Sequence, residues 1–272
     1  MAKEPEVVFK VDHGVGIIRL NRPKKFNGWR ESDTEVVRSY LQRCAEDSSI
    51  LAAVLTGTGE YFTAGADVFS SATLQRPSTM IAHIKFYNEN IFNMFIDFPK
   101  PLVVAVNGPA VGMGVTQLAL ADAVLAAPTA TFLTPFVKIG LTPEGCSTFT
   151  FSQLLGDEAS RRLLEDAEKL DCEEMHRLGL VDEVVPADSL LSRAQSVALE
   201  WASSGRPRRL VERGWKEKLK KVNKEESQAF GEALASRRFY EAQLELARSK
   251  GKHVPAMVWW LFARLVPPLA KL

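Results

Sequence analysis

Hydrophobic residues in the first half of the chain come in short runs that predict β-strands. The runs EVVFKV and GIIRL flank Asp12, His13 and Gly14, a pattern typical of a β-hairpin. The runs LAAVLTG (51–57) and PLVVAVNG (101–108) are continuously apolar and reach a glycine, as expected of strands that are buried on both faces. Two shorter runs, AVLAAP and ATFLTP, follow them.

Polar segments with helical spacing separate these runs, the first of them at residues 34–45. Strands that alternate with helices indicate an α/β fold with mostly parallel strands. Near Gly156 the pattern changes to two short helices, the second capped by Asp171 with Glu174 three positions later. Beyond Pro186 nearly every position up to Ser249 keeps helical spacing. We therefore expect an α/β core over residues 1–186 and a helical C-terminal region over residues 187–272.

Composition and charge restrict the classes of protein that fit this pattern. The 272 residues are 46% hydrophobic and carry 34 basic and 33 acidic side chains, so no global field would draw the protein onto nucleic acid. Three widely spaced cysteines argue against a disulfide framework and favour a reducing compartment. No apolar run approaches the ~20 residues that span a bilayer, and the N-terminus lacks the apolar stretch of a secretory signal. We expect a soluble globular protein without stable membrane insertion.

Two glycine-containing loops stand where α/β proteins bind ligands, at the carboxyl ends of buried strands. They read YFTAGADV (61–68) and NGPAVGMGV (107–115), and the second opens an apolar helical segment whose first amides could face an anion. Each loop alone could be a tight turn. The four histidines are isolated and lack metal-ligand spacing, so we expect no metal site.

A single carboxylate, Glu144, lies in the stretch LTPEGCST (141–148). It could be an acid favoured by a helix N-terminus, or a general base. Apolar neighbours at Phe136, Ile139 and Leu141 would raise its pKa by desolvation, whereas a helix N-terminus would lower it, and the sequence leaves both directions open. Nearby Cys146 is read as a small packing residue rather than as a nucleophile.

Four motifs resemble the crotonase (enoyl-CoA hydratase/isomerase) superfamily: NRPKKFNG (21–28), FTAGADV (62–68), NGPAVGMG (107–114) and LGLVDEVVP (178–186). The resemblance implies a crotonase-type spiral of ββα turns with a helical C-terminal region that builds homotrimers. It also implies acyl-CoA substrates, with CoA as part of the substrate and no separate cofactor. The oxyanion hole would then be formed by the backbone N–H groups of Ala66 and Met113.

Relatives that hydrate enoyl-CoA carry two glutamates, and Thr116 and Phe136 stand at the corresponding positions of this chain. The stretch FLTPFVKIGLTPEGCST (132–148) instead resembles the peroxisomal Δ3,Δ2-enoyl-CoA isomerases, in which the glutamate at the position of Glu144 is the catalytic base. Asn88 matches an asparagine that helps to orient that glutamate. One carboxylate is sufficient to move a proton from C2 to C4 of a 3-enoyl-CoA, a step in the β-oxidation of unsaturated fatty acids.

For CoA, the resemblance implies Lys25 and Phe26 near the nucleotide. It places the loop of Ala64, Gly65, Ala66, Asp67 and Val68 along pantetheine and adenine. The basic run 206–224 could hold the 3′-phosphate but is by default an exposed charged helix face. The last residues, Ala270, Lys271 and Leu272, resemble the S-K-L address read by the peroxisomal import receptor, which predicts the peroxisomal matrix.

Three alternatives remain open at this point. The first is another crotonase-type reaction, such as dienoyl-CoA isomerisation or thioester hydrolysis. The second is a non-catalytic acyl-CoA binding protein. The third is a membrane-surface protein anchored by the aromatic tail after Val254.

Overall fold

The computed structural model describes residues 4–66, 77–249 and 251. Its central element is a sheet with the strand order β1-β2-β3-β4-β6-β9. These strands are Val7–Asp12, Val15–Leu20, Ala52–Gly57, Leu102–Val106, Ala123–Ala126 and Glu183–Val184. β1 pairs with β2 as the predicted antiparallel hairpin, and each later pairing in this sheet is parallel, as the buried apolar runs predict.

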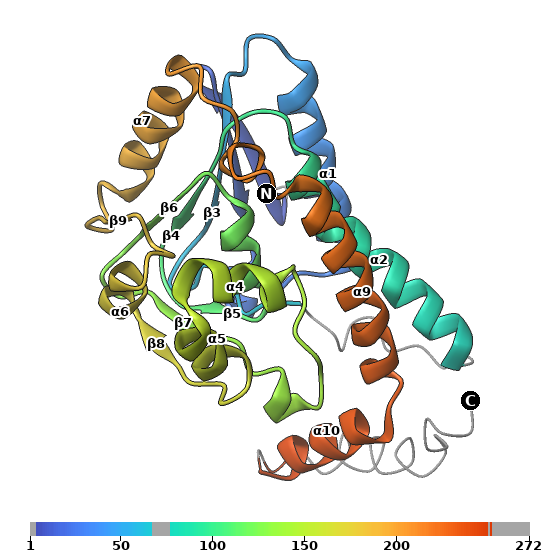
Figure 1. The fold of residues 1–272 in the computed structure, drawn as a ribbon. Helices are drawn as coiled ribbons and strands as arrows, with labels where there is room; N and C mark the ends of the chain where they lie inside the picture. The colour runs from blue at the N-terminus through green and yellow to red at the C-terminus, as the bar shows by residue number, and fades with distance from the viewer. Residues whose placement is uncertain (1–3, 67–76, 250, 252–272) are drawn as a thin grey trace.

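Alternate residues of the central strands enter two separate hydrophobic clusters, because successive side chains of a strand point to opposite faces. Val54, Val103 and Leu125 pack against α7 (Leu190–Ser203) on one face. Leu55, Val104 and Val124 belong to the larger cluster on the other face, which includes residues of α1 (Glu31–Glu46) and α2 (Pro77–Asp97). Figure 1 shows α7 on one side of β3, β4 and β6, and α1 and α2 on the other.

The chain after β4 builds a second, smaller layer beside the sheet. It contains β5 (Ala110–Val111), β7 (Thr131–Leu133) and β8 (Leu170–Asp171), which pair in the order β5-β7-β8. Helices α4 (Ser147–Leu155), α5 (Asp157–Leu164) and α6 (Cys172–Arg177) surround them. The predicted cap of α6 is confirmed, since Asp171 accepts a hydrogen bond from the amide of Glu174 at 2.9 Å.

The apolar segment after the second loop is less helical than expected. α3 covers only Met113–Thr116, a 3-10 helix (η2) continues from Gln117 to Leu120, and Ala121 is extended. The chain has to straighten here because Asp122, next in sequence, accepts a hydrogen bond from the amide of Leu102 at 2.7 Å as β6 begins beside β4.

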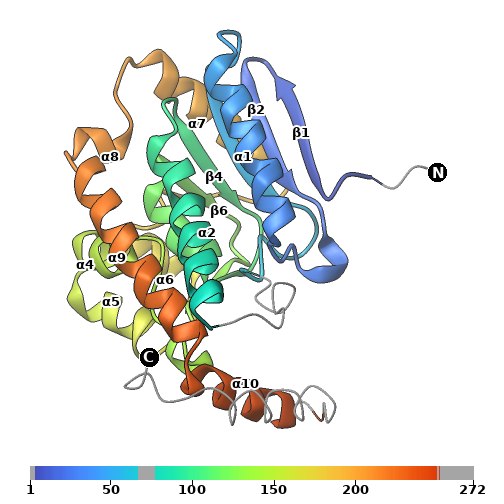
Figure 2. The same cartoon turned by 90° about the vertical axis from the view of Figure 1, so that its right-hand side faces the viewer.

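Helices continue after β9 in the described residues, as the spacing predicts: α7, α8 (Arg209–Glu212), α9 (Lys216–Leu234) and α10 (Arg237–Ser249). α9 runs along α2, and the two helices lie side by side in Figures 1 and 2. The helical region therefore packs directly against the α/β part. The predicted domain boundary near Pro186 stays a prediction.

Part of the basic run is buried, which the default interpretation as an exposed charged face did not anticipate. Arg208 is 5% exposed, and its Nε donates to Asp122 at 2.6 Å. Its other nitrogens donate to the carbonyl oxygens of Phe95, Phe98 and Leu120. Arg208 thereby ties the start of α8 to the core, because a buried charge is tolerated only when it is fully paired.

Candidate functional site

The two glycine-containing loops meet at the carboxyl ends of β3 and β4. The amide of Val111 donates to the carbonyl of Thr63 at 3.0 Å, and Thr63 forms a parallel bridge with Ala110. Asn107, in the second loop, binds the segment that leads into the first loop. Its side chain accepts a hydrogen bond from the amide of Gly57 and donates one to the carbonyl of Gly59. The site predicted from two separate motifs is therefore one continuous backbone surface.

This surface carries the two amides predicted for the oxyanion hole. Met113 is the first residue of α3, so its N–H has no intrahelical partner. Among the described residues, no hydrogen bond is donated by the amide of Met113 or by that of Ala66. Neither amide therefore has an acceptor within the described part of the chain, as a predicted oxyanion donor requires.

Gly65 sets the close contact between the loops. Its φ is +85°, and a Cβ at this position would lie 2.6 Å from the carbonyl oxygen of Val111. A side chain therefore meets both backbone strain and a steric clash with backbone. The position of the Ala66 amide depends on this glycine.

We expect Gly65→Ala to lower kcat/KM for the reaction of this site by about 100-fold, since displacing one oxyanion donor has an effect of that order. Gly205→Ala is the matched control, because Gly205 also has a positive φ (+67°) but no atom within 4 Å of an added Cβ. Steady-state rates of the two variants check this. Equal activity of both variants would show that the loop contact does not position a donor.

Lys25 and Phe26 lie next to the first loop, and their predicted place near the nucleotide of CoA stays a prediction. The carbonyl of Phe26 accepts a hydrogen bond from the amide of Ala64 at 2.8 Å. The Phe26 ring is half exposed and its centroid is 4.7 Å from that of Tyr61. The structure thus brings Lys25, Phe26, Ala64, Gly65 and Ala66 together, whereas the predicted Asp67 and Val68 lie outside the described residues.

Glu144 is buried, with 4% of its surface exposed, and lies in the turn before α4. A Cβ on neighbouring Gly145 would be 2.5 Å from Thr116 Oγ1 and 2.7 Å from a ring carbon of Phe92, so this turn packs tightly against α3 and α2. Thr116 is three residues after Met113, about 4.5 Å along a helix axis. The acid and one predicted oxyanion donor are therefore neighbours.

The carboxyl of Glu144 makes no hydrogen bond to any described residue. Burial, which is the larger cause, and the negative charge of Glu226 together raise its pKa from the usual 4.5 to about 8. Of the two directions that the sequence left open, the shift is upward, as desolvation predicts. An acid with a pKa near neutrality can both accept and return a proton.

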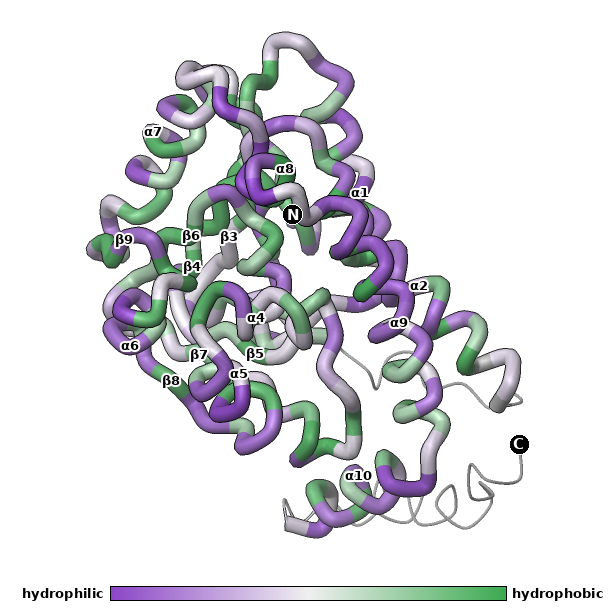
Figure 3. Tube along the Cα trace, in the orientation of Figure 1, coloured by the Kyte–Doolittle hydropathy of each residue, from purple (hydrophilic) through white to green (hydrophobic). Residues whose placement is uncertain are grey.

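Glu226, on α9, is the acid that caps α4, and the sequence interpretation missed it. It accepts hydrogen bonds from the amides of Cys146 (2.6 Å) and Thr148 (2.9 Å) and from the Thr148 hydroxyl (2.5 Å). Glu144 therefore does not serve as the helix-terminal acid. The sequence does carry a signal for a buried role of Glu226. This acid lies on the apolar stripe of α9 formed by Leu219, Val222, Phe230 and Leu234. Figure 3 shows the rest of α9 as mainly hydrophilic.

Asn88 is buried on α2 and lies among side chains of α9. Its Nδ2 donates to Ser227 Oγ at 3.2 Å, one residue from Glu226. Among the described residues, no hydrogen bond joins Asn88 to Glu144, so its orienting role stays a prediction.

Cys146 is a packing residue, as expected. It is fully buried, its Sγ donates to the carbonyl of Leu219 at 3.3 Å, and burial raises the pKa of the thiol. The three cysteines are free. In the described ranges, no group of three or more histidine, cysteine, aspartate or glutamate side chains could hold a metal ion. Within those same ranges, no helix is long and apolar enough to cross a membrane.

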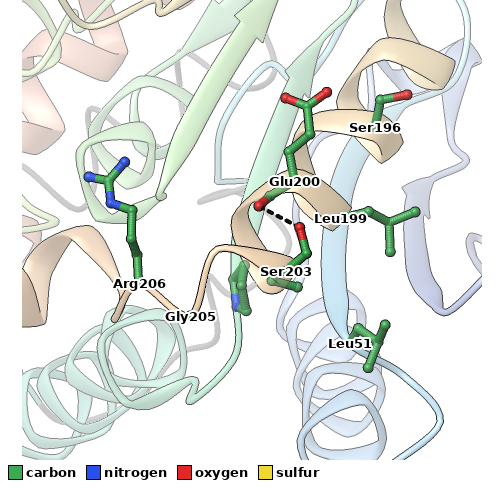
Figure 4. A pocket seen from close by; sticks show the side chains of 9 residues that line it. Leu51, Ser196, Leu199, Glu200, Ser203, Gly205 and Arg206 are labelled. Carbon is green, nitrogen blue, oxygen red and sulfur yellow. Dashed lines mark hydrogen bonds between the residues drawn. The ribbon is translucent and has the colours of Figure 1, made fainter.

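A separate pocket of about 630 Å³ lies at the amino ends of strands β3 and β4. It is lined by Leu51 and Pro101, which precede β3 and β4, and by the end of α7 with Arg206. Figure 4 shows these side chains around the end of α7, where the Ser203 hydroxyl donates to the carbonyl of Glu200. The loops and Glu144 follow the opposite, carboxyl ends of the strands, so this pocket is not part of the candidate site.

Comparisons with known proteins show the family of this chain. A model of the enoyl-CoA hydratase/isomerase family matches residues 10–253. Enoyl-CoA delta isomerase 3, peroxisomal, of Mus musculus is 34% identical over 257 residues, which cover 91% of this chain and 80% of the mouse protein. Enoyl-CoA delta isomerase 2 of Rattus norvegicus is 37% identical over 222 residues, 78% of this chain and 56% of the rat protein, so the chain spans little more than half of that relative.

A solved structure agrees with the fold. The enoyl-CoA hydratase/isomerase of Pseudoalteromonas atlantica T6c superposes with a TM-score of 0.79 at 29% identity, covering 91% of this chain and 98% of that chain. The crotonase-type fold predicted from the four motifs is confirmed.

Proposed function

Because the chain belongs to the enoyl-CoA hydratase/isomerase family, we propose that it is a Δ3,Δ2-enoyl-CoA isomerase with Glu144 as its only catalytic acid–base group. The observation that carries the proposal is a buried carboxyl with a pKa of about 8 and no hydrogen bond to a described residue, on a turn that packs against the helix that begins at Met113. Thr116 and Phe136, both buried, stand where hydratases carry their acids. Among the described residues, the proposed site then has one proton carrier, and neither of these two positions supplies a second acid to activate water.

In the proposed reaction the substrate thioester oxygen accepts hydrogen bonds from the amides of Ala66 and Met113. The Glu144 carboxylate removes a proton from C2 of the 3-enoyl-CoA, and the electron pair delocalises onto the thioester oxygen. The two amides stabilise this dienolate more than the ground state. Glu144 then gives the same proton to C4, which leaves the double bond between C2 and C3 and returns the carboxylate.

The environment of Glu144 suits this shuttle. A carboxyl with an ordinary pKa would be a weak base and, once protonated, would lose its proton readily to water. Burial raises the pKa of Glu144 toward the pH of the working solution. At that pH the proton-accepting and proton-donating forms of the carboxyl are both accessible. The proposed orienting role of Asn88 would act through its contacts with α9, since Ser227 is its hydrogen-bond partner.

The remaining assignments follow from the same proposal. Lys25, Phe26 and the first loop would bind the CoA part of the substrate, with no separate cofactor, and the subunits would form a homotrimer. The C-terminal Ala270, Lys271 and Leu272 would be read by the peroxisomal import receptor, in line with the word peroxisomal in the name of the mouse relative.

The test is a direct comparison of two reactions catalysed by the intact protein. We expect conversion of trans-3-hexenoyl-CoA to trans-2-hexenoyl-CoA with a kcat/KM at least ~10²-fold above that for hydration of the 2-enoyl product, because one catalytic acid–base group is worth about this factor. Hydration as fast as isomerisation would contradict the proposal. Tight CoA binding without either reaction would support a non-catalytic acyl-CoA binding protein instead.

A further inference from the structure

The turn that carries Glu144 is held from the other half of the chain. Cys146 and Thr148 lie at the start of α4, and the carboxylate of Glu226 on α9 accepts three hydrogen bonds from them. Glu226 is 6% exposed and is separated from Cys146 by 80 residues in sequence. A buried carboxylate with three donors is strongly fixed in place.

The backbone of this turn needs such support. Gly145 and Cys146 follow Glu144 directly, and both have a left-handed conformation, with φ values of +72° and +63°. For a cysteine this conformation is strained, because its Cβ comes close to the backbone. The hydrogen bond from the Cys146 amide to Glu226 acts at the strained residue itself, two positions from the acid.

Glu226 also supplies the charge that acts on Glu144. α4 has no charged side chain, and α3 and η2 have none either. Several titratable groups on the elements packed against α9 have partners other than Glu144 and Glu226. Asp97 of α2 pairs with Lys216 and Lys220, Arg237 of α10 pairs with Glu241, and Cys146 donates to Leu219.

We propose that Glu226 is a positioning residue for Glu144: it fixes the turn that carries this acid and presents a second negative charge to it. The proposal rests on the proposed function for its effect on turnover, but its two structural consequences can be measured without any reaction. In this proposal the helical C-terminal region supports the site through Glu226, a residue that does not touch the substrate.

Glu226→Gln tests the proposal because it keeps the size of the side chain and removes its charge. We expect the acidic limb of the kcat/KM profile, which follows ionisation of Glu144, to move to lower pH by about one unit, because the neighbouring negative charge is gone. We also expect kcat at the optimum to fall about tenfold, since Glu144 becomes a weaker base on a looser turn. A purely structural residue would lower kcat without moving the limb.

Glu225→Gln is the matched control. Glu225 is the preceding residue of the same helix, its side chain is 63% exposed, and it lies 3.9 Å from Lys221. This variant removes the same charge from the same helix without changing a contact of α4. The acidic limb of its kcat/KM profile should therefore stay at the native pH. Equal shifts in the two variants, or no shift in Glu226→Gln, would overturn the proposal.

A reciprocal measurement separates failure of this proposal from failure of the isomerase assignment. The proposal requires Glu226 to be charged when Glu144 ionises, so in Glu144→Gln the carboxyl of Glu226 should titrate below the pH at which Glu144 titrates in the native protein. Infrared difference spectra of the protonated carboxyl band, with the Glu144→Gln/Glu226→Gln double variant as blank, report both titrations without substrate. This measurement also holds if Glu226→Gln does not fold. A Glu226 carboxyl that titrates above Glu144 would overturn the proposal even in an active isomerase.

Discussion

Glu144→Gln is expected to lower kcat for isomerisation of trans-3-hexenoyl-CoA by about 10³-fold, while KM changes by only a few-fold. The variant keeps the shape of the side chain but cannot take a proton from C2, and general acid–base groups contribute factors of this order. KM should hold because the proposed CoA contacts of Lys25, Phe26 and the first loop do not involve the carboxyl of Glu144.

The structure offers a control for this experiment. Glu173 is an exposed acid on α6, so Glu173→Gln makes the same chemical change outside the site. It should keep native kcat. If Glu144→Gln retained more than about a tenth of native kcat, the proton would have to be carried by another group.

The same substitution is expected to stabilise the protein at alkaline pH. The folded-state pKa of Glu144 is raised to about 8, above the 4.5 of an unfolded chain. Between these values the native state binds more protons than the unfolded state, so the stability of the native protein falls as pH rises from 4.5 to 8. Above pH 8 the full penalty of the buried charge is present, and it corresponds to about 5 kcal/mol.

Glutamine carries no such charge. The free energy of unfolding of Glu144→Gln should therefore exceed that of the native protein by about 5 kcal/mol at pH 9 and match it near pH 4. Urea denaturation at the two pH values measures both. A difference that does not depend on pH would mean that the carboxyl of Glu144 is not buried in the charged form.

These two expected results describe one compromise. An unpaired carboxyl in an apolar site destabilises the fold at the pH at which it works as a base. The cost is retained because a hydrogen-bonded or exposed glutamate would have a lower pKa and would be a weaker base.

Much of this arrangement follows from local sequence. The strands could be predicted because β3 and β4 are buried on both faces and therefore read as continuous apolar runs. The loops could be predicted because Gly65 needs a left-handed backbone beside another chain segment. Glu144 stood out as the only carboxylate of its stretch, and the order of the four motifs placed it in a family.

Other features depend on contacts that sequence patterns do not report. The cap of α4 comes from Glu226, and no local pattern links residues 146 and 226. The direction of the Glu144 pKa shift depends on how completely the tertiary structure excludes water, which flanking residues alone do not determine. The early end of α3 follows from the pairing of β6 with β4, a non-local requirement that overrides helix propensity.

Transfer of deuterium tests the central claim most directly. If one buried carboxyl moves the proton, trans-3-hexenoyl-CoA labelled with deuterium at C2 and converted in ordinary water should give 2-enoyl product with part of the label at C4. Nuclear magnetic resonance of the product measures this fraction. Label at C4 is the result that a single Glu144 shuttle predicts; a product whose C4 hydrogen comes entirely from solvent would contradict it.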